Sequence, residues 1–266
     1  MLGFGVGVGA DSSAKLERWT TGAHRDPGNA DRNAYRHPSE TLEFFGLEPT
    51  MTVVEIWPSR GWYTEILAPF LRADGKYYAA GFALTAKRTP EWRKKMQRQL
   101  EKKLAAHPDL YDRVVATELS IPERTEIAPP GTADMVLTFR NVHNWMKGDY
   151  APQMFKAMFD ALKPGGVLGV VEHRAKAGTS VEKMIESGYV TEMEVKRLAK
   201  DAGLRFVASS EVNANPRDTA DHPLGVWTLP PTLRLGDKDR GKYIAIGESD
   251  RMTLKFIKPK KRRDRK

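Results

Sequence analysis

The chain has 266 residues, of which 40% are hydrophobic and 29% charged, and it contains no cysteine. This composition is typical of a globular protein with one full core, and it excludes disulfides, cysteine-ligated zinc and thiol nucleophiles. Because no run of 18 apolar residues occurs, the sequence predicts no membrane-spanning helix.

The formal net charge of +9 is distributed unevenly. Eight basic residues and one acidic residue lie in 255–266, and eight basic residues lie in 87–103. Such runs can contact nucleic acid or anionic lipid, or serve as a nuclear address. The simpler interpretation is a solvated helix face and a frayed tail.

Residues 1–38 are predicted to form an N-terminal leader and a segment that covers the core. The leader, 1–14, is rich in glycine and apolar residues, so it is either disordered or the remnant of a signal peptide without a basic region. We favour a cytoplasmic location, with export as the alternative.

From residue 39 onward, the spacing of apolar residues predicts strands alternating with helices. Strands are expected at 52–57, 76–82, 114–119, 133–139, 167–172, 204–210 and 252–257, and helices at about 39–47, 62–71, 90–106, 150–162 and 191–202. His37 or Ser39 should cap the first helix, Pro69 should end or kink the second, and Thr191 with Glu194 forms a capping box.

This order predicts an α/β fold with three layers and a mostly parallel sheet, whose C-terminal strand is antiparallel. The main domain should span 39–258 and be followed by a basic tail at 259–266. Residues 213–250 separate the last two strands, and a connection of that length is usually a lid or a binding insert.

The segment Thr52–Glu65 reads as a buried strand, a tight turn and the start of a helix, with Glu55 near the end of the strand. It resembles motif I of the class I methyltransferases that depend on S-adenosylmethionine (SAM), whose pattern is acid-x-Gly-x-Gly-x-Gly. Glu55 takes the acidic position and Gly61 that of the last glycine. Trp57 and Ser59 replace the other two glycines, so the loop should follow another path.

Further segments strengthen the resemblance. Residues 132–145 resemble the fourth-strand motif of the family, and 140–142 are similar to the Leu-Arg-Asn-Val segment of quinone-type C-methyltransferases. Residues 161–168 are close to the family's Leu-Lys-Pro-Gly-Gly turn. The chain from about 40 to 258 is also similar to a bacterial family of predicted methyltransferases, through 55–58, 140–145 and 247–254. The resemblance implies a Rossmann-like methyltransferase fold and SAM as cofactor.

The cofactor-binding residues that this resemblance implies are Glu55, Trp57, Ser59, Gly61, Tyr63, Phe82, Glu118 and Asn141. Glu55 would lie near the methionine amino group or order the loop, unless it is a buried carboxylate satisfied by the turn. The family places an acid after strand 2 for the ribose, but this chain has Phe82 there. Phe82 or Trp57 could stack on adenine or belong to the core. Glu118 could face the adenine amine or be a surface acid.

Residues after the fourth and fifth strands should face one cleft, because parallel strands end at the same edge of a sheet. His143 or His173 could act as general base, and Arg140 or Arg174 could bind an anionic substrate or the SAM carboxylate. Trp145, His222 and Trp227 complete the predicted substrate site, although Trp227 could instead plug the sheet edge. The histidines with Glu172 and Asp221 lack metal-ligand spacing, so no metal is predicted.

The function favoured by the sequence is SAM-dependent methyl transfer to a small-molecule acceptor. One alternative is a methyltransferase-like protein that has lost or altered its use of SAM and binds another ligand. The substitution Trp57→Gly should then improve SAM affinity, whereas it should abolish activity in a working methyltransferase. A second alternative is a nucleic-acid methyltransferase, although no Asn-Pro-Pro-Tyr-type motif follows the fourth strand.

Overall fold

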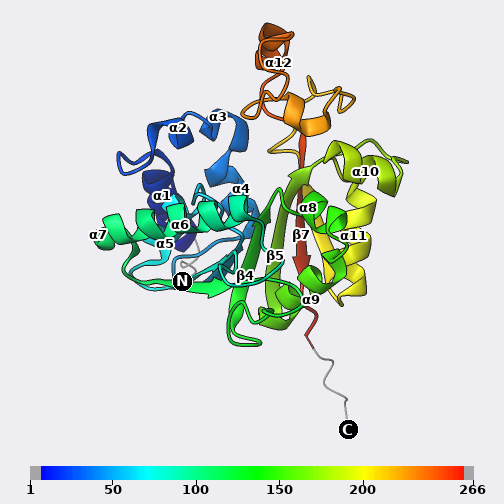
Figure 1. Cartoon of the computed structure of the whole chain (residues 1–266). Helices are drawn as coiled ribbons and strands as arrows, with labels where there is room; N and C mark the ends of the chain where they lie inside the picture. Colours follow the sequence, from blue (N-terminus) through cyan, green and yellow to red (C-terminus); the bar gives the residue numbers. More distant parts are fainter. Residues whose placement is uncertain (1–6, 261–266) are drawn as a thin grey trace, which may run out of the picture.

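The computed structural model describes residues 7–260, which form a seven-stranded sheet between two layers of helices (Figure 1). The strands are β1 (Thr52–Ile56), β2 (Lys76–Gly81), β3 (Val114–Glu118), β4 (Ala133–Phe139), β5 (Leu162–His173), β6 (Arg205–Ser210) and β7 (Arg251–Ile257), in the spatial order β3-β2-β1-β4-β5-β7-β6. Strands β1 to β5 are parallel, and β7 is antiparallel to both β5 and β6. The predicted three-layer α/β fold with an antiparallel C-terminal strand is confirmed.

Helices cover both faces of the sheet. The helical segments are α1 (Gly7–Thr21), α2 (Pro27–Ala30), α3 (Asn33–Arg36), α4 (Pro38–Phe45), α5 (Thr64–Leu71), α6 (Glu91–Ala106), α7 (Pro108–Tyr111), α8 (Val142–Lys147), α9 (Ala151–Ala161), α10 (Val181–Ser187), α11 (Glu192–Asp201), η1 (Gly225–Thr228) and α12 (Arg240–Ile246). Side chains of α1, α4 and α5 share one hydrophobic cluster, and those of α8 to α11 share the other.

The pleat of the central strands explains these two clusters. Successive side chains of a strand point to opposite faces, so Val53 of β1 joins the α5 cluster while Val54 and Ile56 join the α9 cluster. β4 is buried along nearly its whole length, as a central parallel strand covered on both faces should be. The sheet therefore fixes which side chains near its carboxyl edge face the core.

Several short elements differ from the prediction. α8 replaces an expected loop after β4, while α10, η1 and α12 had not been predicted, because helices of four to seven residues carry too little periodicity to be recognised. β5 begins at Leu162 rather than 167, since Leu162 pairs with Ala133 across a register shift. Neither predicted cap of α4 forms, because no side chain accepts a hydrogen bond there.

Other local predictions hold. Pro69 lies in the last turn of α5, which ends at Leu71, where a proline interrupts few helical hydrogen bonds. The Oγ1 of Thr191 accepts a hydrogen bond from the backbone N–H of Glu194 at 3.2 Å, which confirms the helix start and one half of the predicted capping box. The other half is wrong, because the backbone N–H of Thr191 donates to Sδ of Met184 and the Glu194 carboxylate accepts from Arg197.

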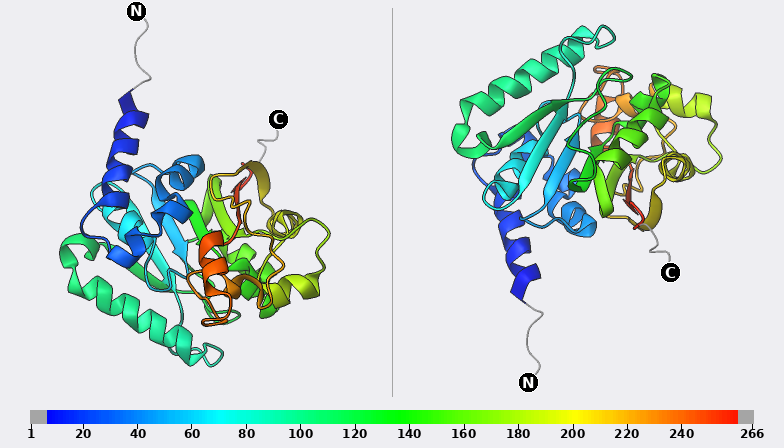
Figure 2. Two further views of the ribbon diagram at one scale, coloured as in Figure 1. Left: turned by 90° about the horizontal axis from the view of Figure 1, so that it is seen from above. Right: turned by 90° about the horizontal axis from the view of Figure 1, so that it is seen from below.

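The N-terminal segment covers the α5 face. Gly7–Thr21 forms α1, so a disordered leader is wrong for residues 7–14. Leu16 is 1% exposed and packs with Leu42 and Phe45, and Figure 2 shows α1 along the side of the sheet layer. Residues 1–6 and 261–266, which hold part of the predicted leader and most of the basic tail, lie outside the described residues.

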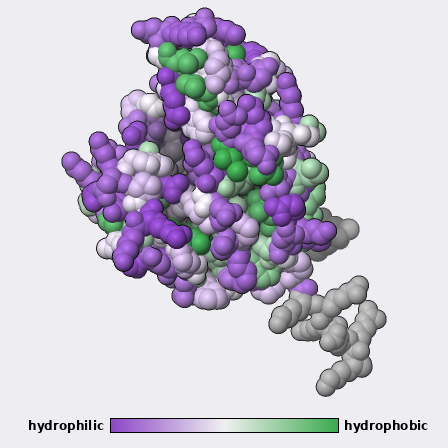
Figure 3. Space-filling view, turned by 45° about the vertical axis from the view of Figure 1, so that its right-hand side comes forward, coloured by the Kyte–Doolittle hydropathy of each residue, from purple (hydrophilic) through white to green (hydrophobic). Residues whose placement is uncertain are grey.

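None of the helices within residues 7–260 combines the length and apolar character needed to cross a membrane. On the face drawn in Figure 3, hydrophilic residues cover most of the surface. This distribution agrees with the uneven but abundant charge of the sequence.

Candidate functional site

A cleft lies at the carboxyl edge of the parallel strands, beneath the segment that carries α12 (Figure 1). Its inner part is a cavity of about 230 Å³ lined by Ser59, Arg140, Asn141, His143 and His173, together with Trp57, Phe82, Trp92, Arg93, Val226, Trp227 and residues 230–232. The insert 213–250 therefore forms one wall of the site.

Two larger cavities adjoin the inner one through shared lining residues. A cavity of about 880 Å³ lies between α8, α10 and the insert, and shares Trp92, His143 and Trp227 with the inner cavity. A cavity of about 430 Å³ reaches the loops at 119–122 and 148–153, and shares Trp57, Phe82 and Arg93. The cleft thus extends across the ends of β1 to β5.

A buried carboxylate–histidine pair lies at the inner cavity. The Nδ1 of His143 lies 3.0 Å from Oε1 of Glu172, which is 0% exposed. The backbone N–H groups of His143 and His173 also donate to Glu172, at 3.3 and 2.8 Å. A carboxylate accepts hydrogen bonds, so Nδ1 carries the proton and Nε2 is left as the acceptor.

The acceptor nitrogen of His143 is directed to the cleft. Its Nε2 lies 2.9 Å from the side-chain amide Nδ2 of Asn144, which donates to it. Both residues line the inner cavity. A substrate hydroxyl or amine that displaced this amide would meet a nitrogen able to take its proton.

His173 lies beside this pair but in a different electrostatic environment. Its ring centroid is 5.3 Å from that of His143, and its Nδ1 is 2.5 Å from Oγ of Ser249. Burial, together with His143 and the neighbouring guanidinium of Arg251, holds the pKa of His173 well below its usual range. The imidazole is therefore neutral at physiological pH.

His143, Glu172 and His173 are also the group that could hold a metal ion within the part of the chain the structure describes, with ligand atoms within 4.8 Å of one another. Glu172 already accepts from one imidazole and two backbone N–H groups. These hydrogen bonds account for the close approach of the three residues. The absence of a metal remains a prediction.

The motif I loop follows an unusual path around Trp57. Trp57 and Ser59 adopt left-handed backbone conformations with φ of 49° and 58°, and Gly61 has φ of 81°. The φ of Gly61 lies in a region that L side chains rarely adopt, so any other residue at this position would be strained. The loop thus accommodates the two replaced glycines by strained backbone.

The indole of Trp57 reaches from the end of β1 to the end of β3. Its Nε1 donates to the carbonyl of Leu119 at 3.0 Å, and its ring lies 4.9 Å from that of Phe82. The guanidinium of Arg93 lies 4.3 Å from the ring centroid, in the range of a cation–π contact. This stack stands between the 230 and 430 Å³ cavities, which both include its three residues.

Glu55 does not line the cleft. Its side chain shares a face of β1 with Val53, and its Oε2 accepts hydrogen bonds from Tyr77 Oη at 2.5 Å and Thr64 Oγ1 at 3.1 Å. Burial raises the pKa of Glu55 to about 7, although both hydrogen bonds oppose the shift. Glu55 therefore ties β1 to β2 and α5, and its predicted contact with a cofactor has no direct path.

The raised pKa of Glu55 makes a prediction for stability. The folded protein binds the proton more tightly than the unfolded chain, whose pKa is 4.5, so stability falls as pH rises from about 4.5 through about 7. The loss amounts to about 3 kcal/mol. Urea unfolding at pH 5 and pH 8 should show the wild type losing this amount relative to Glu55→Gln, and a pH-independent difference would contradict the assignment.

Three other predicted cofactor residues serve structural contacts. Tyr63 is buried and stacks on Phe139 with ring centroids 3.6 Å apart. Asn141 lines the cavity, but its Nδ2 donates to the carbonyl of Ile56 at 3.0 Å and so joins β4 to β1. Glu118 pairs with Arg124 at 2.9 Å and accepts from a backbone N–H.

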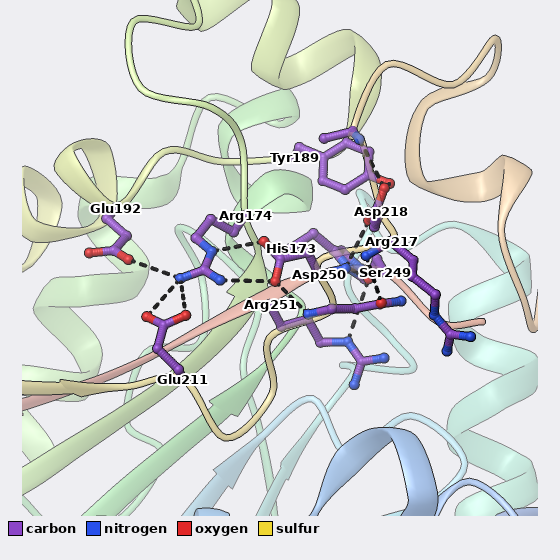
Figure 4. A network of polar contacts seen from close by, with 12 residues as sticks. His173, Arg174, Tyr189, Glu192, Glu211, Arg217, Asp218, Ser249, Asp250 and Arg251 are labelled. Carbon is purple, nitrogen blue, oxygen red and sulfur yellow. Dashed lines mark hydrogen bonds and ion pairs between the residues drawn. The ribbon is translucent and has the colours of Figure 1, made fainter. Parts of the chain in front are cut away.

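Arg174 forms ion pairs with three carboxylates and does not line the inner cavity that His143 and His173 share. Figure 4 shows it between Glu192, Glu211 and Asp250. Its Nε and Nη2 donate to the two carboxylate oxygens of Asp250 at 2.8 and 2.9 Å, and its Nη1 lies 2.8 Å from Glu211. Because three carboxylates surround this guanidinium, its charge is already matched, and Arg174 joins the end of β5 to Asp250 at the start of β7.

The predicted substrate residues are only partly brought together. Trp227 lines the inner cavity, with its ring centroid 6.0 Å from that of His143. His222 lines the larger cavity and bonds Asp218 at 2.8 Å. Trp145 is 0% exposed and packs on Trp57 and Phe155, so it is a core residue.

The sequence did not point to Trp92 and Arg93 as site residues. Both lie in the first turn of α6, where neighbouring charges suggest a solvated face, yet both line the inner cavity. A tryptophan in so polar a helix was the available signal. The contact of Glu172 with His143 was also missed, although the sequence placed Glu172 at the end of β5.

Comparison with known proteins places the fold. No protein-family model matches the chain, and no curated protein matches it. Among solved structures, it is similar to a SAM-dependent methyltransferase from Aquifex aeolicus, with 18% identity, a TM-score of 0.56, and coverage of 92% of this chain and 98% of the other.

Two further solved structures are similar over most of this chain. Phosphoethanolamine N-methyltransferase 2 from Haemonchus contortus, in complex with SAM, has 16% identity and a TM-score of 0.56, over 94% of this chain and 57% of that one. The cyclase SpnF has 15% identity and a TM-score of 0.55, over 94% and 93%. Together with the strand order, these similarities show that the chain has the Rossmann-like fold of class I SAM-dependent methyltransferases.

Proposed function

We propose that this protein transfers the methyl group of SAM to a small-molecule acceptor, with His143 as general base. The observation that carries the proposal is the buried Glu172–His143 pair, whose acceptor nitrogen faces a cleft at the carboxyl edge of a methyltransferase fold. A fold alone does not determine chemistry, as similarity to a cyclase illustrates. The Glu172–His143 pair adds a group that can take a proton from the acceptor.

The residues of the cleft fit SAM in kind. Trp57 and Phe82 are aromatic residues of the kind that stack on adenine, and both line two adjoining cavities of the cleft. The inner cavity of about 230 Å³ is below the roughly 300–1,000 Å³ of ligand pockets, but it adjoins the 430 Å³ cavity across the Trp57–Arg93 stack. Because this chain has Phe82 rather than an acidic residue after β2, groups other than a carboxylate at that position would bind the ribose of SAM.

The chemistry divides between the cofactor and the chain. When bound, SAM supplies an electrophilic methyl group. His143 takes the acceptor's proton at Nε2, while Glu172 keeps the ring oriented and stabilises the imidazolium that forms. Trp227 and the insert limit access of water to this nitrogen.

The basic helix gives little support to nucleic acid as the substrate. Arg93 is stacked on Trp57, Lys103 is paired with buried Glu65, and Lys94 with Glu91. These contacts leave α6 with fewer cations directed outward than its sequence suggests. An affinity for nucleic acid that falls steeply as salt is added would support this alternative.

Calorimetric titration with SAM and with S-adenosylhomocysteine tests the proposal. Micromolar binding of both is the expected result. Failure of both ligands to bind at millimolar concentration would overturn it and favour a methyltransferase-like fold with another ligand. A methyl-acceptor screen by release of S-adenosylhomocysteine then identifies the acceptor class.

The Trp57→Gly variant should bind S-adenosylhomocysteine about tenfold more weakly, because it removes a stacking face worth about 0.5–1.5 kcal/mol and frees the loop. Trp57→Phe keeps the face but loses the hydrogen bond to Leu119, and serves as the control. Calorimetry of the folded variants gives both affinities. A gain in affinity in Trp57→Gly would show that the indole obstructs the cofactor.

A further inference from the structure

An arginine cluster is linked to His173 through Ser249, whose Oγ lies between the imidazole and Arg251. Arg32, Arg36 and Arg251 share the carboxylate of Glu248, with N–O distances of 2.5, 3.3 and 2.5 Å. Arg36 and Arg251 are 2% and 1% exposed. The cluster therefore joins the segment before α4 to the start of β7 in a buried environment.

Arg140 adds a fourth guanidinium to this cluster. Burial and the charges of Arg251 and Arg32 lower the pKa of Arg140 to about 10, and Arg140 in turn contributes to the lowered pKa of Arg36. The backbone at Arg140 is left-handed, with φ of 59°. Strained backbone is kept where surrounding structure requires it, and here it directs Arg140 into the inner cavity.

Positive charge in the cluster exceeds negative charge. Three guanidinium groups share the single carboxylate of Glu248, and the charge of Arg140 acts on the same group of residues. Glu65 is occupied by Arg25 and Lys103, and Glu55, which also influences Arg140, is bonded to Tyr77 and Thr64. Buried charge without a partner is unfavourable, so the excess positive charge of the cluster favours binding of an anion.

Guanidinium N–H groups without hydrogen-bond partners also indicate an anion. Within residues 7–260, Arg36 Nη1 and Arg32 Nη2 are buried and have no hydrogen-bond partner. Over the same residues, the Arg140 side chain takes part in no recorded ion pair, while it lines the cavity. Natural proteins rarely leave buried donors unsatisfied, and a bound ion is one common reason.

The cluster is also coupled to the proposed catalytic site. Ser249 Oγ contacts Nδ1 of His173 at 2.5 Å and lies 3.5 Å from Nε of Arg251, and Figure 4 shows these three residues together. His173 in turn is adjacent to His143. Arg140 lines the same inner cavity as His143 and His173, so an anion at Arg140 would lie in the cavity that the proposed general base faces.

We propose that Arg140, supported by Arg32 and Arg36, binds a carboxylate or phosphate group of the methyl acceptor. This inference rests on the proposed function and narrows it to anionic acceptors. A planar guanidinium suits either oxyanion, because its donors match two oxygens at once. The carboxylate of SAM is another group that Arg140 could bind, and the test below distinguishes it from an anionic group of the acceptor.

The test is calorimetric titration of the full chain with inorganic phosphate and with acetate, each with and without saturating S-adenosylhomocysteine. Arg140→Met should weaken anion binding at least tenfold. Arg72→Met removes the same charge from an exposed pair with Asp112 and is the matched control, expected to bind as the wild type. Thermal unfolding should show Arg140→Met to be at least as stable as the wild type in anion-free buffer, since repulsion is relieved.

The outcomes are distinct. Anion binding that depends on Arg140 and persists with S-adenosylhomocysteine present supports the proposal. Failure of both anions to bind, an equal loss in Arg72→Met, or displacement by S-adenosylhomocysteine overturns it. If S-adenosylhomocysteine binds and anions do not, the methyltransferase proposal stands alone. If anions bind and S-adenosylhomocysteine does not, the anion site belongs to a different reaction.

Discussion

Replacing Glu248 with glutamine is expected to lower the free energy of unfolding by about 3–5 kcal/mol, because it leaves buried guanidinium groups without their shared carboxylate. Burial alone would raise the pKa of Glu248, but Arg251, Arg36 and Arg32 outweigh it and lower the pKa to about 2. The stabilisation is therefore present above pH 4.5 and is lost as pH falls through about 2.

Urea unfolding at neutral pH measures this loss. Glu186→Gln is a suitable control, since Glu186 pairs with Lys183 at the surface and its loss should change stability by less than about 1 kcal/mol. Added phosphate should restore part of the stability of Glu248→Gln if an anion can replace the carboxylate. A difference no larger than the control's would show that the arginines do not depend on Glu248.

Replacing His143 with glutamine is expected to lower kcat for methyl transfer by roughly 10²–10⁴-fold, the usual contribution of a general base. The affinity for S-adenosylhomocysteine should not change, because the substitution removes proton transfer rather than cofactor contacts. Steady-state kinetics with the acceptor from the screen gives kcat, and calorimetry gives the affinity. His107→Gln, at an exposed position, is the control.

Glu172→Gln tests the positioning role separately. An amide can still bond Nδ1, but it stabilises an imidazolium less, so the rate should fall less than in His143→Gln and the pH–rate profile should shift to lower pH. An unchanged kcat in His143→Gln would show that the acceptor needs no base from this chain. A fallen kcat with an unchanged profile in Glu172→Gln would assign Glu172 a structural role only.

The sheet could be predicted because its signal is local. Apolar strands such as β4 and the turn residues between elements reveal themselves within a few residues, and the β–α alternation then restricts the topology. The same reasoning placed Arg140, His143 and His173 at one edge, where the structure has them. The sequence can thus predict which residues lie at the end of a strand.

The direction of side chains was harder to predict. Glu55 alternates with Val54 and Ile56, which face the α9 cluster, so the period of two sends Glu55 toward α5 rather than to the cleft. Arg174 lies at the correct edge, but three acids separated from it in sequence neutralise it. Arg32 and Glu248 are 216 residues apart, and no local pattern encodes such a pair.

The late position of β7 has a consequence for synthesis. Domains generally fold as units as they leave the ribosome. Arg32 and Arg36 emerge long before Glu248, and β5 and β6 wait for the strand that joins them. The nascent chain therefore holds unmatched cations and two open sheet edges until β7 arrives, and premature termination before residue 248 would leave a product exposed to aggregation and degradation.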